Sequence, residues 1–100
     1  MKASCSFDDT RRGILRDPQA AAIYLEEMLQ DGDMEQFTEA LKHVAEAQGG
    51  VMRVSKKTRL NRETLYRTLS KDGNPRLDTL SKVLGALGLR IGVVPVEAHT

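Results

Sequence analysis

Apolar side chains recur at three- and four-residue spacing through most of this chain, and the spacing predicts five amphipathic helices. The helices are expected to cover about residues 18–31, 34–48, 51–58, 62–72 and 77–87. The inward stripes of the first and the last consist of Ala21, Tyr24, Leu25, Met28 and Leu29, and of Leu77, Leu80, Val83, Leu84 and Leu87. The pattern therefore predicts an all-α fold.

Residues typical of helix ends stand at the expected boundaries. Asp17, Asp33 and Asn61 each precede a predicted helix, where a side-chain oxygen can accept a hydrogen bond from an unpaired backbone N–H. Gly88 follows the last apolar stripe and suits a left-handed cap, with Leu89 packing back onto the helix.

The apolar period changes at residues 89–95, where alternate positions are apolar, and this indicates a short β-strand. The chain offers no second convincing strand, and an isolated strand has unpaired backbone groups on both edges. We therefore expect it to pair with a second copy in a homodimer or with a partner protein; a loosely ordered tail is the alternative. The residues expected to pair are Leu89, Arg90, Ile91 and Val93.

Length and composition are those of one soluble globular domain: 100 residues, 40% apolar and 29% charged. No apolar run approaches the roughly 20 residues of a membrane helix, and the first residues lack the apolar core of a signal peptide. Cys5 is the only cysteine, which fits a reducing cytoplasm. We expect a cytoplasmic protein with an N-terminal segment at 1–16, a single helical domain at 17–95 and a tail at 96–100.

The net charge of +1 conceals a division between the two halves of the chain. Residues 1–48 hold five Lys or Arg residues against ten acids, a net charge of −5, whereas residues 49–100 hold ten against four, a net charge of +6. Such a division suggests a polyanionic partner for the basic half. The alternative is a basic surface that is merely solvated.

Residues 51–70 combine two short helices with a connection of about three residues, which predicts a helix-turn-helix arrangement. Val54, Leu60, Leu65 and Leu69 are placed to share one small core. The second helix then presents the opposite face outward, and the predicted outward residues are Arg62, Glu63, Tyr66, Arg67 and Ser70.

These outward residues suit the DNA major groove. Arg can bind guanine, Glu can accept from cytosine, and Tyr can contact a phosphate or a thymine methyl group. Alternatively, Arg67 could pair with Glu63 on a solvated face, and Tyr66 could be half-buried in the core. Further basic residues flank the face where phosphates would run, namely Arg53, Lys56, Lys57 and Lys71.

The stretch VSKKTRLNRETLYRTLSKDGNPRLDTLSKVLGALGLR resembles the helix-turn-helix of the lambda-repressor/Cro-like (XRE) class. The blocks LNRETLYRTLS, GNPRLDTL and ALGLRIGVVP, taken in this order, are similar to the addiction-module antidote proteins, the HigA-like antitoxins. The resemblance extends over about residues 7–95.

The resemblance implies a five-helix DNA-binding domain that represses its own operon and neutralises a small RelE-like toxin that cleaves messenger RNA. It implies base contacts from Arg62, Glu63, Tyr66 and Arg67. It implies phosphate contacts from Arg53, Asn61, Ser70 and Lys71, to which Lys56 is added from its position. The expected toxin is basic, and acids of the first two helices could complement it: Glu26, Glu27, Asp31, Glu35, Glu39 and Glu46.

Two positions depart from the pattern of the class. Arg59 stands where the turn usually has Gly, so a positive φ there would cost roughly 1 kcal/mol. Ser55 stands where the first helix usually has Ala, and its hydroxyl needs a partner, for which a carbonyl one turn back is expected.

Two other readings remain open: a phage-type or chromosomal regulator without a toxin, and a protein-interaction module whose basic face is incidental. We expect no enzyme, because no nucleophile has an evident base and no phosphate-binding loop is present. We expect no metal or other cofactor, since His43 and His99 lie far apart in sequence and His43 is expected at the surface.

Overall fold

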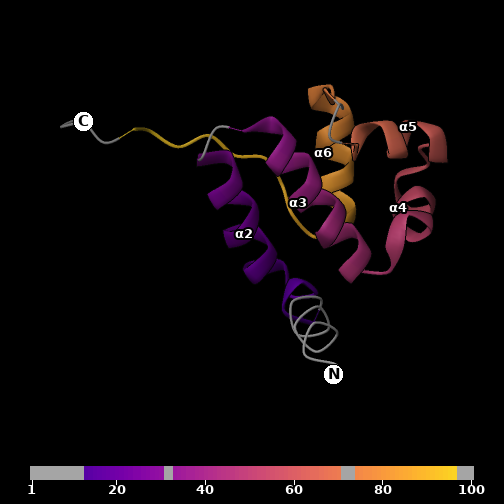
Figure 1. Cartoon of the computed structure of the whole chain (residues 1–100), viewed down its shortest axis with the longest axis horizontal. Coiled ribbons are helices and arrows are strands. Elements are labelled where there is room, and N and C mark those ends of the chain that lie inside the picture. Colours follow the sequence, from indigo (N-terminus) through magenta and orange to yellow (C-terminus); the bar gives the residue numbers. More distant parts are fainter. Residues whose placement is uncertain (1–12, 31–32, 71–73, 97–100) are drawn as a thin grey trace.

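The computed structural model describes residues 13–30, 33–70 and 74–96, and these residues form an all-α fold (Figure 1). Its helices are α2 (Pro18–Gln30), α3 (Met34–Ala47), α4 (Gly50–Thr58), α5 (Arg62–Thr68) and α6 (Leu77–Ala86). Each of the five helices predicted from the sequence is present. Residues 13–15 add one further helical turn.

The helices form two parts that meet at α4. The helices α2 and α3 lie side by side, while α4 contacts α3, α5 and α6 (Figure 1). The pair α4 and α5 lies at the end of the molecule away from α2. The basic residues of α4 and α5 therefore lie at one end of the fold.

One apolar core joins all five helices. Its most deeply buried large side chains include Leu41 of α3, Leu65 of α5 and Leu87, the C-cap of α6. The buried apolar residues are Leu15, Ala21, Leu25, Phe37, Ala40, Leu41, Val44, Ala45, Ala47, Val54, Leu65, Leu69, Val83, Leu84 and Leu87. Their three- and four-residue spacing is the pattern that predicted the helices.

The predicted N-caps are confirmed. The side chains of Asp17 and Asp33 accept from the N–H two residues later, at 3.2 and 3.0 Å. The side chain of Asn61 accepts from the Thr64 N–H at 2.7 Å. These bonds satisfy donors that the first turn of a helix leaves unpaired.

The predicted cap of the last helix is also confirmed. Gly88 has φ +83°. The Leu89 N–H donates to the Leu84 carbonyl at 2.8 Å, and the Gly88 N–H donates to the Gly85 carbonyl at 3.1 Å. This is the Schellman arrangement, and Leu89 packs back against the core. A Cβ at Gly88 would lie 3.3 Å from Cγ of Pro18, so α6 ends close to the start of α2.

The fourth helix ends earlier than predicted, at Thr68 rather than near residue 72. The backbone N–H and the hydroxyl of Ser70 both donate to the Arg67 carbonyl, at 3.3 and 3.0 Å, and close a tight turn there. Residues 71–73, around the predicted end of this helix, lie outside the described residues.

Two residues of the predicted stripes are not buried. Leu29 is 54% exposed and Leu77 is 69% exposed. Both line an apolar groove of about 330 Å³ between α2, α3, α6 and residues 89–92. They face space that the described part of the chain leaves unfilled. The prediction that they are buried was therefore wrong, because helical spacing does not show whether another element covers that side of the helix.

No strand is formed in the described residues, and the predicted strand at 89–95 is therefore not confirmed. This segment runs from α6 toward α2 without regular structure (Figure 1). Its first part lines the groove, whereas Val93, Val94 and Val96 are 95%, 77% and 84% exposed. A strand needs a partner ladder, and residues 13–30, 33–70 and 74–96 of one copy supply none.

Polar contacts tie the helices together at their edges. The guanidinium Nε of Arg16 donates to the Ala47 carbonyl at 3.3 Å, and Nε2 of Gln48 donates to the Leu87 carbonyl at 3.2 Å. The hydroxyl of Tyr24 shares a hydrogen bond of 3.1 Å with Nδ1 of His43. His43 is half-buried rather than fully at the surface as predicted, because the side chain of Tyr24 on α2 reaches its ring.

The two glycines of α6 and its cap allow a matched stability test. Gly88→Ala should lower the free energy of unfolding by about 1–2 kcal/mol, because Ala tolerates the left-handed conformation poorly. Gly85→Ala should raise it by about 0.5–1 kcal/mol, since Gly85 is helical and a Cβ there meets nothing within 4 Å. Thermal unfolding followed by circular dichroism measures both; equal effects would contradict the cap.

Candidate nucleic-acid interface

The connection between α4 and α5 consists of residues 59–61. Arg59 adopts φ +65° and ψ +16°, and its N–H donates to the Ser55 carbonyl at 2.8 Å. It is the one residue other than Gly with positive φ in the described part of the chain. Arg59 therefore adopts the left-handed conformation whose cost was considered from the sequence.

Two hydroxyl groups hold the turn. The Ser55 hydroxyl donates to the Leu60 carbonyl at 2.7 Å, not to a carbonyl one turn back as predicted. The Thr58 hydroxyl donates to the Val54 carbonyl at 2.8 Å and accepts from the Leu60 N–H at 3.1 Å. The chain reverses direction after Arg59, and this brings the Leu60 carbonyl closer to Ser55 than sequence spacing suggests.

The small core shared by the two helices is confirmed. Val54, Leu65 and Leu69 are 2%, 0% and 3% exposed, and Leu60 packs against them from the turn. Burying side chains of this size stabilises by about 1.5–3 kcal/mol each. The packing therefore outweighs the cost of about 1–2 kcal/mol for the left-handed Arg59.

The outward face of α5 is the predicted one. Arg62, Glu63, Tyr66 and Arg67 on α5 and Ser70 just after it are exposed, and Tyr66 is exposed by 58%. Glu63 and Arg67 form no ion pair with each other. Among the described residues, the one ion pair within 4 Å joins Arg76 and Asp78. The face therefore keeps its charges available.

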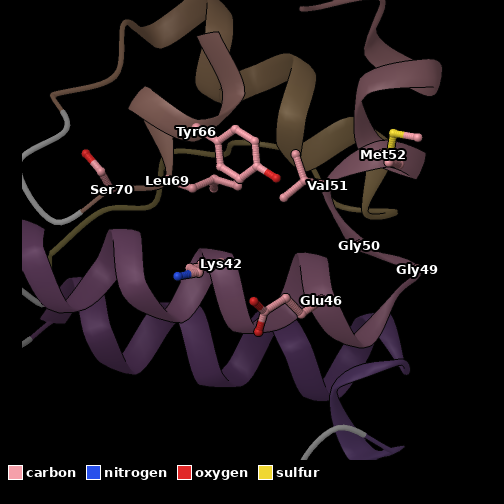
Figure 2. A pocket seen from close by; sticks show the side chains of 9 residues that line it. All are labelled: Lys42, Glu46, Gly49, Gly50, Val51, Met52, Tyr66, Leu69 and Ser70. Carbon is pink, nitrogen blue, oxygen red and sulfur yellow. The ribbon is translucent and has the colours of Figure 1, made fainter. Parts of the chain in front are cut away.

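Tyr66 also borders a groove of about 500 Å³ between α3 and the α4–α5 pair (Figure 2). Its ring lies over the groove with Val51 and Leu69, while Lys42 and Glu46 line the groove from α3 (Figure 2). Tyr66 is thus exposed but supported along one side. This positions the ring at the edge of the α5 face rather than in the core.

The residues predicted to contact phosphate differ in what the fold leaves available. Arg53 and Lys56 are exposed on α4 and have no ion pair in the described chain. The side-chain oxygen of Asn61 already accepts a hydrogen bond from the Thr64 N–H as the cap of α5. The hydroxyl of Ser70 already donates to the backbone carbonyl of Arg67. Lys71 lies outside the described residues.

Charge is segregated along the fold. In residues 50–70 the basic residues are Arg53, Lys56, Lys57, Arg59, Arg62 and Arg67, and the one acid is Glu63. On α2 and α3 the exposed acids are Glu26, Glu27, Glu35, Glu39 and Glu46. Asp31 lies outside the described residues. The two helix pairs therefore present surfaces of opposite sign.

Other kinds of site find little support in the described residues. No group of three or more His, Cys, Asp or Glu side chains there could hold a metal ion. None of the described helices is long and apolar enough to cross a membrane.

A model of the family described as "Probable addiction module antidote protein" matches residues 5–95. The match covers most of the chain, and the chain belongs to this family. Antidote proteins of addiction modules are the antitoxins of toxin–antitoxin pairs, so membership implies a toxin partner.

A relative from Haemophilus influenzae, named only "Uncharacterized protein", is 37% identical over 71 residues. The aligned part is 71% of this chain and 72% of the relative. No solved structure matches the chain.

The hydroxyl of Ser55 gives a test of the turn. Ser55→Ala should lower the free energy of unfolding by about 1–2 kcal/mol, because it leaves the half-buried Leu60 carbonyl without its donor. Ser81→Ala is the control, since Ser81 is exposed on α6 and Ala is a better helix former. Urea unfolding of both variants measures the difference; no loss with Ser55→Ala would show that the bond does not hold the turn.

Proposed function

We propose that this antitoxin is a sequence-specific DNA-binding regulator of the lambda-repressor/Cro-like class, similar to the HigA-like antitoxins, that represses its own operon. The observation that carries the proposal is the exposed face of α5 above a buried apolar core. On this face Arg62, Glu63 and Arg67 form no ion pair with any residue that the structure describes, and Tyr66 lies beside them. A rigid short helix that presents such side chains suits the major groove. The proposal assigns the chain no catalytic activity.

Base recognition falls to α5 in this proposal. Arg62 and Arg67 can each bind guanine in bidentate fashion, and Glu63 can accept from cytosine. Tyr66 lies beside them, at the edge of the protein groove between α3 and the α4–α5 pair, and can contact a thymine methyl group or a phosphate. Arg53 and Lys56 on α4 then contact the backbone of the DNA.

Protein partners are proposed for the other end of the molecule. We propose that residues 89–95 pair with a second copy to form a homodimer, because the exposed valines and the unfilled apolar groove lie there. A two-fold dimer would place two α5 helices about 34 Å apart and bind a palindromic operator.

We also propose that the toxin is a basic, RelE-like RNase. The exposed acids of α2 and α3 would complement it and speed its association. A regulator without a toxin would have the same DNA-binding face, so binding of the purified toxin separates the two possibilities.

The DNA proposal is tested with a labelled fragment of the operon's own promoter and a scrambled duplex. We expect selective binding of the promoter and a steep fall in affinity between 50 and 200 mM salt, because bound phosphates release counterions. Arg62→Ala should weaken promoter binding by about 1–3 kcal/mol and relax base preference at one position.

Lys82→Ala is the control for Arg62→Ala, because Lys82 is an exposed cation on α6, outside the proposed face. Equal weakening of the Arg62 variant on every sequence would mean that Arg62 contacts only phosphate. Absence of any preference for the promoter at either salt would overturn the proposal and favour a protein-interaction module.

Dimer formation is tested by Ile91→Pro, which removes a backbone donor from the proposed ladder. The variant should sediment as a smaller species than the wild type, or lose its complex with the toxin, while its helical circular dichroism is unchanged. Val96→Pro serves as the control because it lies just beyond the predicted strand. Unchanged sedimentation of Ile91→Pro, alone and with toxin, would exclude strand pairing.

A further inference from the structure

Arg59 occupies a backbone conformation that suits glycine. Its φ of +65° lies in the left-handed region, where an L side chain is strained and Gly is not. The other positive φ angles in the described residues belong to Gly49, Gly50 and Gly88. Arg59 alone keeps a long side chain at such a position.

The turn itself makes no use of that side chain. The hydrogen bonds that hold residues 59–61 come from the backbone N–H of Arg59 and from the hydroxyls of Ser55 and Thr58. The guanidinium makes no hydrogen bond or ion pair in the described chain, and Arg59 is exposed. Gly could therefore form the same turn with less strain.

The position of Arg59 explains what a cation could do there. It follows Lys56 and Lys57 at the end of α4 and precedes Arg62, the first residue of α5. Arg59 therefore lies in the connection between the two helices that the proposed function places on DNA, and its exposed side chain starts from that turn. Strain that the fold does not need is commonly found at binding sites.

We propose that Arg59 is a phosphate-binding residue of the DNA interface. Its side chain supplies a cation at a position where glycine would be less strained. The inference rests on the proposed function and adds a contact from the turn to those of α4 and α5. A guanidinium can bind a phosphate with two parallel hydrogen bonds, without reading the base sequence.

The proposal predicts opposite effects of one substitution on stability and on binding. Arg59→Gly should raise the midpoint of thermal unfolding by roughly 2–6 °C, because it relieves the left-handed strain. The same variant should bind both the promoter fragment and the scrambled duplex roughly threefold to tenfold more weakly. Its slope of log K against log salt should be shallower by about 0.9, the change expected for one lost phosphate contact.

Three further variants separate the effect of the charge at position 59 from the effect of backbone strain there and from the effect of the protein's net charge. Arg59→Asn tolerates the left-handed region but is neutral, so it should lose affinity as Arg59→Gly does. Arg59→Lys keeps both the charge and the strain and should retain the wild-type salt slope. Lys82→Gln removes one exposed cation from α6, outside the proposed face and the proposed dimer segment, and should leave affinity and slope unchanged.

Wild-type affinity and salt slope in Arg59→Gly would overturn the role of Arg59 while leaving the DNA proposal intact. A lower unfolding midpoint in Arg59→Gly would show that the side chain stabilises the fold and would also overturn it. Wild-type protein that binds no duplex in a salt-dependent manner would overturn the DNA proposal, and this inference with it.

Discussion

The rest of the structure depends on the burial of Val54 and Leu65 beneath a three-residue turn. Val54 lies on α4, which contacts α3, α5 and α6, so the same apolar contact fixes α5 against the remainder of the core. Leu65 holds one side of α5 against this core, so α5 exposes the opposite side. The outward orientation of Arg62 and Tyr66 follows from this packing and not from any contact of their own.

Charge follows the same division of the molecule. The exposed acids lie on the α2–α3 pair, and the cations gather on α4, α5 and their turn at the other end (Figure 1). Charges that are not neutralised within the chain are available to partners of opposite sign. An antidote protein has a toxin as its partner, and the structure leaves the acidic helices, the apolar groove and the basic face accessible at once.

The sequence predicted most of the fold because its signals are local. Apolar spacing, the caps at Asp17 and Asn61 and the left-handed Gly88 involve residues within one or two helical turns of each other. The failures involve distant neighbours. Leu29 and Leu77 have helical spacing but face an unfilled groove, and His43 is half-buried because Tyr24 of another helix reaches it. The predicted contacts with DNA remain predictions.

The sequence by itself determined the five helices, their caps, the charge division and the residues on the outward side of α5. Only the tertiary structure decided that Ser55 bonds across the turn to Leu60 and that Arg59 carries the strained backbone, with a side chain that pairs with none of the described residues. It also decided that residues 89–96 form no strand within the described part of one chain. The reason is physical: helix formation and capping depend on near neighbours, whereas a reversed turn, a groove and a strand ladder depend on groups brought together by packing.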